Sequence, residues 1–271
     1  MLTASICVNA QDFDVSDYVN YMRDANMSEE AQSLMWEGLD GMTHRQANKT
    51  FAAGKSLSQS GYAVGDYFLG WCYEAGEGGA SVDAKESVRY FMKATNASVP
   101  FPWAYQALGI HYSYGAGVDK DARKAFLCYE KGAETISSDY LKGECLCSMA
   151  VAYKYGEGVS QDMEYACRLY EKAAKLGNPR AMRNLSNCYS SGDGVTKDYA
   201  KAFYWQEQAG LAGDADYLFL SALTYLTGQY VFDETKKQSV TIDKQKGISY
   251  LKQAASMGSS DAMQALREIN K

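Results

Sequence analysis

A tyrosine with a glycine three residues later recurs five times along the 271-residue chain, and this recurrence limits the fold more than any other feature. Successive tyrosines lie 39, 41, 36 and 36 residues apart. The pairs are Tyr73 and Gly76, Tyr112 and Gly115, Tyr153 and Gly156, Tyr189 and Gly192, and Tyr225 and Gly228. A second glycine follows two residues later in the first four copies. Self-similarity at this period is typical of tandem structural repeats and argues against one globular core.

Each copy has the pattern of two helices joined by a glycine turn. In the copy at residues 181–213, Met182, Leu185 and Tyr189 are spaced three and four residues apart, which predicts a helix with one apolar stripe. The glycines that follow favour the left-handed backbone that ends a helix. Asp198 then provides a carboxylate that can accept hydrogen bonds from the free amides at the start of a second helix.

Such a helix pair is too small to bury its apolar face alone, so it must pack against a neighbouring pair. We therefore expect an all-α fold, a solenoid of about five repeats with capping helices at both ends. The expected segments are an N-terminal cap or degenerate repeat at 11–60, repeats at about 61–97, 103–136, 143–178, 180–213 and 214–258, and a C-terminal capping helix at 259–271. An insertion at 229–242 within the fifth repeat fits either a small β-hairpin or a loop.

The repeated pattern, LGxxYxxGxGVxxDxxKAxxxYxKAA, resembles the Sel-one-like repeat, a relative of the tetratricopeptide repeat. One copy carries it as Leu108-Gly109, Tyr112, Gly115-Ala116-Gly117-Val118, Asp121, Lys124-Ala125 and Tyr129-Glu130-Lys131. The resemblance covers roughly residues 60–271. It implies a right-handed α/α superhelix that serves as a non-catalytic scaffold or adaptor for other proteins.

The same resemblance implies where a partner would bind, because the first helix of each pair lines the concave face in tetratricopeptide relatives. Positions of this helix that vary between copies are then expected to face the groove. The expected partner-binding residues are Tyr67, Trp71, Gln106, Ile110, Cys147, Arg180, Arg183, Asn184, Asn187, Phe219, Leu220 and Leu223.

Both ends of this set are aromatic or aliphatic, whereas Arg183, Asn184 and Asn187 make its centre polar. These three side chains could grip the backbone or a carboxylate of an extended peptide. Two plainer interpretations stay open. The polar residues could form an ordinary solvated helix face, and Tyr67 and Trp71 could pack under the N-terminal cap.

Charge and residue spacing narrow the class of partner. The net charge is −6 and no basic stripe is present, which argues against nucleic acid. No apolar run approaches the ~20 residues of a membrane span. We expect no metal or cofactor, because neither His44 nor His111 has a second ligand at metal-binding spacing on its helix. The partner is thus expected to be a protein or an extended peptide, and the chain itself a monomer.

A second function class stays open because the chain holds 22 tyrosines and 4 tryptophans, whose rings can also stack on sugars. A carbohydrate-binding or cell-envelope hydrolase-related protein is therefore the alternative. An enzyme of that kind would need an acid and a base close together in a pocket, whereas a scaffold needs only an open groove.

The first ten residues differ from the rest of the chain. They are apolar and end in Val8-Asn9-Ala10, a small-x-small pattern that resembles a signal-peptide cleavage site before Gln11. Residues 1–10 are therefore interpreted as a signal-peptide remnant, which predicts a secreted or periplasmic protein. The run lacks a basic start, so a cytoplasmic location is the alternative.

The seven cysteines show no spacing that indicates a disulfide framework. Cys128, Cys145 and Cys167 stand at repeat positions that hold apolar residues in other copies. We interpret these three as buried thiols that act as small hydrophobic side chains.

Overall fold

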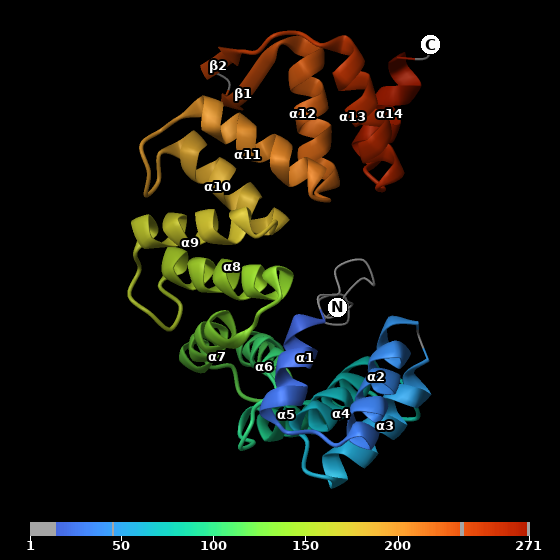
Figure 1. Ribbon diagram of the computed structural model, residues 1–271. Coiled ribbons are helices and arrows are strands. Elements are labelled where there is room, and N and C mark those ends of the chain that lie inside the picture. The colour runs from blue at the N-terminus through green and yellow to red at the C-terminus, as the bar shows by residue number, and fades with distance from the viewer. Residues whose placement is uncertain (1–14, 45, 234–235, 270–271) are drawn as a thin grey trace. The chain divides into compact units, whose positions relative to one another are not determined.

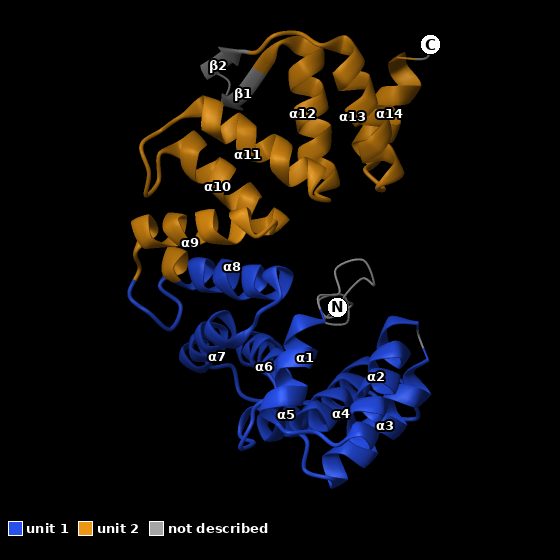
Figure 2. Cartoon of the chain, viewed as in Figure 1, with its two compact units in different colours: residues 1–152, 156–160 blue, residues 153–155, 161–271 orange. Residues whose placement is uncertain are grey.

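Helices make up nearly all of the computed structural model, which describes residues 15–44, 46–233 and 236–269 (Figure 1). The chain divides into two compact units (Figure 2). Unit 1 contains residues 1–152 and 156–160, and unit 2 contains residues 153–155 and 161–271. The proposed signal-peptide remnant at 1–10 lies outside the described residues. The predicted all-α fold of repeated helix pairs is confirmed.

Unit 1 is a succession of helices in which each helix from the second to the sixth packs on the one that follows it. Its helices are α1 (Ser16–Asp24), α2 (Glu29–Thr43), α3 (Ala47–Gln59), α4 (Ala63–Ala75), α5 (Ala84–Thr95), α6 (Trp103–Tyr114), α7 (Ala122–Thr135) and α8 (Asp139–Tyr155), whose last three residues belong to unit 2. Ser28 caps the start of α2, since its hydroxyl accepts a hydrogen bond from the Ala31 amide at 3.2 Å. No helix among the described residues of either unit is both long and apolar enough to cross a membrane.

Unit 2 continues the same pattern and adds one hairpin. Its elements are α9 (Met163–Lys175), α10 (Pro179–Ser191), α11 (Tyr199–Leu211), α12 (Ala215–Thr227), β1 (Gln229–Asp233), β2 (Lys236–Ser239), α13 (Lys244–Ser256) and α14 (Ser260–Ile269). Strands β1 and β2 pair antiparallel, with Gln229 opposite Ser239. Of the two interpretations of the insertion at 229–242, the hairpin is therefore correct. A core of fully buried Leu218, Ala222, Leu251, Ala254 and Ala262 joins α12, α13 and α14.

One pair of hydrogen bonds closes the turn of every repeat. In each copy the amide of an aspartate donates to the carbonyl of the repeat tyrosine at 2.9–3.0 Å, and these repeat aspartates are Asp83, Asp121, Asp162, Asp198 and Asp243. The carboxylate of that same aspartate then accepts from an amide in the first turn of the second helix, as Asp121 Oδ1 does from the Lys124 amide at 2.9 Å. The tyrosine-to-aspartate spacing is thus fixed by a backbone hydrogen bond followed by a helix cap.

The two glycines of the turn have different tasks. The first ends the first helix in the left-handed conformation, with φ of +71° at Gly115. The second lies against the repeat before it. A Cβ atom built on Gly117 would overlap the carbonyl oxygen of Ala84, the first residue of α5, and Gly194 has the same relation to Met163 at the start of α9. The second glycine therefore permits close stacking of consecutive repeats.

Candidate partner-binding surface

Five of the predicted groove residues lie in the core of unit 1. Tyr67, Trp71, Gln106, Ile110 and Cys147 are each no more than 9% exposed. The prediction that these side chains face an open groove is therefore wrong for this unit. Their variation between copies reflects different packing neighbours and not exposure to solvent.

The aromatic members of this group show what covers them. Trp71 packs with Ala47, Met42 and Phe51 of the helices before α4. Tyr67 lies beside Phe101, with ring centroids 5.0 Å apart. The plainer interpretation, in which Trp71 packs under the N-terminal helices, is confirmed.

The predicted polar centre lies in unit 2 and is accessible. On α10, Arg180 and Asn187 are exposed, and Arg183 and Asn184 are half-buried. Asn184 Nδ2 donates to the carbonyl of Arg180 at 2.8 Å, which fixes the amide along its own helix. All four residues come from one face of a regular helix that begins with Pro179 behind the Asn178 cap.

A network between α10 and α12 holds two of these side chains in place. Arg183 Nη1 lies 3.3 Å from Asp214 Oδ2, and its guanidinium sits 5.7 Å from the ring centroid of Tyr217. The Tyr217 hydroxyl donates to Asn187 Oδ1 at 3.1 Å. Burial raises the pKa of Tyr217, so the phenol stays protonated and remains a donor. Arg183 and Asn187 are therefore presented in fixed positions.

Asp214 is the anchor of this network because it makes two kinds of contact at once. Its Oδ1 accepts from the Tyr217 amide at 3.2 Å and caps α12, while Oδ2 faces Arg183. Neither Asp214 nor Tyr217 was predicted as a site residue. The sequence carries a signal for Asp214, since an aspartate immediately before a run of residues with helical periodicity is a typical helix start.

The apolar members of the predicted set continue along α12 with graded exposure. Leu220 is 42% exposed, Leu223 is half-buried, and Phe219 is half-buried against the core of unit 2. Leu220 and Leu223 are three residues apart and so share a helix face. An aliphatic strip therefore lies on the helix that also supplies Tyr217.

The pair formed by Glu74 and His111 is buried and is not an accessible acid–base site. Glu74 Oε2 lies 3.9 Å from His111 Nε2. Burial raises the pKa of Glu74 to about 7 and lowers the pKa of His111, so desolvation outweighs attraction between the two side chains at this distance. Across the described residues, no three His, Cys, Asp or Glu side chains gather as a metal-binding group.

The cysteines follow the repeat register with one exception. Cys145 and Cys167 are buried, as predicted, whereas Cys128 is only half-buried. Burial raises the pKa of Cys128 to about 11. A hydrogen bond between the Cys167 and Cys188 thiols raises the pKa of the first and lowers that of the second.

Comparison with known proteins agrees with the repeat register. The family model for the Sel1 repeat matches residues 63–99, 104–134, 143–178, 179–214 and 217–259. A solved Sel1 repeat protein from Oxalobacter formigenes is 26% identical with a TM-score of 0.70, over 87% of this chain and 89% of that chain. A search of curated proteins finds no match.

Two further solved structures are similar. The protective antigen c5321 of uropathogenic Escherichia coli, which displays an SLR fold, is 27% identical with a TM-score of 0.69, over 92% of this chain and 50% of that chain. This chain thus spans half of that antigen. The immunity protein PA5088 from Pseudomonas aeruginosa shares the fold, at 18% identity and a TM-score of 0.52, over 95% of this chain and 88% of that chain. Because the repeat model covers more than half of its residues, the chain belongs to the Sel1 repeat family.

Proposed function

We propose that this chain is a non-catalytic scaffold that binds an extended segment of another protein across α10 and α12 of unit 2. Sel1 repeat proteins are generally protein-interaction scaffolds, which supports the general class. The observation that carries the specific proposal is the network of Asp214, Arg183, Tyr217 and Asn187. It holds polar groups rigidly on an accessible helix face, and such preorganisation lowers the entropic cost of binding.

The network also favours one kind of contact. Arg183 already faces Asp214, so its charge is partly neutralised and capture of a carboxylate is weakened. Asn187 is exposed, and its amide nitrogen can donate to a peptide carbonyl while Tyr217 holds its oxygen. Leu220 and Leu223 offer apolar contact beside it. The favoured ligand is therefore an extended backbone with an aliphatic or aromatic side chain.

The alternative, a carbohydrate-binding or envelope-hydrolase role, has no observation in its favour on this surface. The polar groups here are amides, a phenol and an ion-paired arginine, a set without an accessible acid and base facing one another.

A peptide array probed with the purified full chain tests the proposal. We expect the double variant Arg183→Ala/Asn187→Ala to lose roughly tenfold or more in affinity for the peptides selected by the wild type. The matched control is Arg168→Ala on α9, which removes an arginine of similar exposure that pairs with Glu164 within its own helix. Unchanged binding by the double variant, or an equal loss in the control, would overturn the proposal.

We also propose that the chain acts outside the cytoplasm, on the cleavage-like pattern before Gln11. N-terminal sequencing of the protein from its native host tests this. A native N-terminus at Gln11 would support export, and one that retains Met1 would contradict it.

A further inference from the structure

Helix α1 is attached to unit 1 by three side chains. Asp17, Tyr18 and Tyr21 are its buried residues, at 1%, 0% and 3% exposure. On its outer side, Val15 and Val19 are 44% and 48% exposed. A nine-residue helix has little stability in water alone, so α1 depends on the surface it covers. It therefore has the anchor pattern of a bound peptide.

The carboxylate of Asp17 occupies a site with three donors. Its Oδ2 accepts from Trp103 Nε1 at 2.8 Å and from the Ser138 amide at 3.1 Å, and its Oδ1 accepts from the Ser137 amide at 2.6 Å. Ser138 precedes α8 and provides no side-chain cap for that helix. Asp17 thus supplies, from more than a hundred residues away, the hydrogen-bond acceptor that the Ser138 side chain does not provide at the start of α8.

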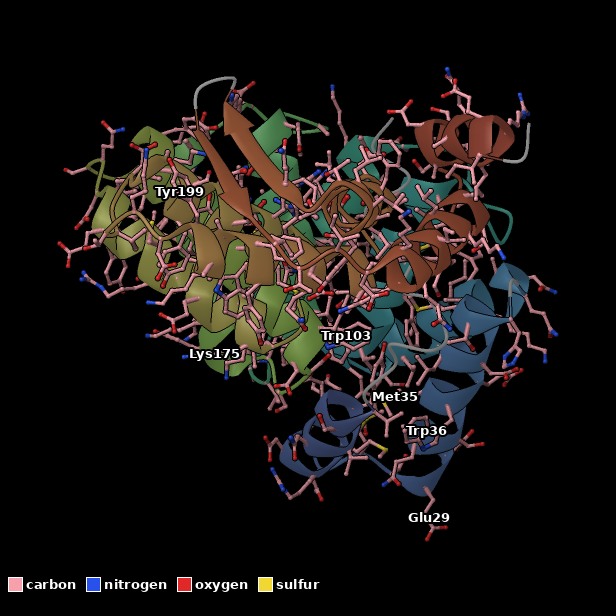
Figure 3. All side chains as sticks on the ribbon, turned by 90° about the horizontal axis from the view of Figure 1, so that it is seen from above. Glu29, Met35, Trp36, Trp103, Lys175 and Tyr199 are labelled. Carbon is pink, nitrogen blue, oxygen red and sulfur yellow. The ribbon has the colours of Figure 1, made fainter. Side chains whose placement is uncertain are left out.

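The two tyrosines of α1 enter an aromatic pocket. Trp103 and Trp36, both labelled in Figure 3, flank Tyr18 with ring centroids 5.0 Å and 6.3 Å from its ring. The rings of Tyr18 and Tyr21 both lie beside that of Phe101, with ring centroids 5.1 Å and 5.3 Å apart. These distances are typical of favourable aromatic pairs.

Tyr21 accepts a hydrogen bond at the start of α4, as Asp17 does at the start of α8. Its hydroxyl accepts from the Val64 amide at 3.4 Å, at the start of α4, which likewise has no side-chain cap of its own. By contrast, the second helices α5, α7, α9, α11 and α13 are all capped by their own aspartates. The starts of the first helices α4 and α8 are therefore completed by α1 and not by their own repeats.

We propose that this surface, the α1 socket formed by Val64, Tyr67, Phe101, Trp103, Ser137 and Ser138, is a binding site for a helical peptide of a partner protein, and that α1 occupies it in cis. The ligand chemistry is the pattern that α1 itself presents: an aspartate followed by aromatic residues one and four positions later. This proposal rests on the proposed function only in assuming that the chain is a protein-binding scaffold, because the α1 socket lies in unit 1 and the α10–α12 surface lies in unit 2.

The tether sets how strongly α1 competes with a partner. Only residues 25–28 join α1 to α2. Even a flexible linker of this length would hold α1 at an effective concentration of about 1 mM, so if α1 itself has a Kd of about 10 µM for the open socket, a competing peptide binds the closed chain about 100-fold more weakly than the open one. Removing the α1 anchors should therefore expose binding that the intact chain hides.

The test uses a fluorescent peptide of residues 15–27, VSDYVNYMRDANM, and measures its anisotropy with full-length protein. The full chain carrying Asp17→Ala/Tyr18→Ala is expected to bind the peptide at least tenfold more tightly than the wild type. Adding Trp103→Phe, which keeps a ring but removes the Nε1 donor, should abolish most of that gain. The control Val15→Ala/Val19→Ala changes the outer side of α1 and should leave the socket closed.

A second experiment is used if circular dichroism shows that the double variant does not fold. A protease recognition sequence inserted after Ala25 in the otherwise wild-type chain allows α1 to be cut and then exchanged for the labelled peptide. Failure of both opened forms to bind the peptide would overturn the proposal, as would dimers in which one copy's α1 fills another copy's socket. Arg183→Ala/Asn187→Ala should leave this binding unchanged, so the two functional proposals can fail separately.

Discussion

Replacing the second glycine of a repeat by alanine is expected to destabilise the fold more than replacing the first, although both have the same backbone conformation. Gly115 and Gly117 each have φ of +71°. An L-residue in the left-handed region costs roughly 1–2 kcal/mol, and this cost applies equally at both positions. Any difference between the two variants must therefore come from what the added methyl group meets.

At Gly115 the atoms nearest to a new Cβ belong to the exposed residue Lys120, at 3.2 Å or more, so a small shift of the loop relieves the contact. At Gly117 the new Cβ would overlap the main-chain carbonyl of Ala84. That group is part of α5 and cannot move without separating two repeats. Overpacking of this kind costs roughly 1–3 kcal/mol. We expect a loss of about 1–2 kcal/mol for Gly115→Ala and about 2–5 kcal/mol for Gly117→Ala.

Urea unfolding followed by circular dichroism measures both losses, and native-state hydrogen exchange of the α5 and α6 amides shows where they act. The second measurement is needed because helical repeats can unfold in parts. Asparagine tolerates the left-handed region, so Gly115→Asn should recover part of the loss while Gly117→Asn should not. Equal destabilisation by the two alanine variants, within about 0.5 kcal/mol, would refute the role assigned to the second glycine.

Three further predictions concern single carboxylates. Glu207 Oε1 accepts from Tyr225, Tyr250 and Lys246 at 2.7–2.9 Å, so Glu207→Ala should cost unit 2 about 2–4 kcal/mol in urea unfolding. The control Glu171→Ala, which removes a half-buried carboxylate paired with Lys175 on its own helix, should cost about 0.5 kcal/mol or less. Because burial raises the pKa of Glu74 from 4.5 to about 7, the wild type should lose up to about 3 kcal/mol of stability as the pH rises from 4.5 to 7. Glu74→Gln should not show this loss, and parallel plots of stability against pH for the two proteins would contradict the prediction. Asp198→Ala should cost about 1 kcal/mol by removing the cap of α11, whereas Asp198→Asn should cost little; equal melting losses would exclude the cap.

The repeat architecture could be predicted from the sequence because its determinants are local. Asp121 closes the turn to Tyr112 and caps α7 within a few residues of chain, and Gly115 ends α6. Each of these interactions favours particular residue types at particular spacings. The same local chemistry recurs in every copy, so the signal is repeated and stands out above chance.

The binding surface was less predictable because its determinants are not local. The positions of Tyr67 and Cys147 differ between copies, and such variation predicts exposure to the groove. Both are buried, and part of what covers this face is α1, which lies outside the repeats. The hydrogen bond from the Ser138 amide to Asp17 joins residues 121 positions apart, and no periodic pattern could indicate it. On α10, by contrast, Arg180 and Asn187 are exposed, and Arg183 and Asn184 are half-buried.

The fifth repeat shows why additions of this kind leave the repeat intact. The backbone hydrogen bond that closes the turn is the same in length, 3.0 Å, whether it joins Tyr112 to Asp121 or Tyr225 to Asp243. The second pair is separated by twice as many residues, 18 against 9, because β1 and β2 lie between its members. Doubling a loop costs only about 0.6 kcal/mol of closure entropy, which the paired strands and the retained aspartate cap of α13 can offset. Closure is therefore nearly indifferent to what the turn contains, so new surface can be added at turns and ends while the repeat residues continue to specify the stack.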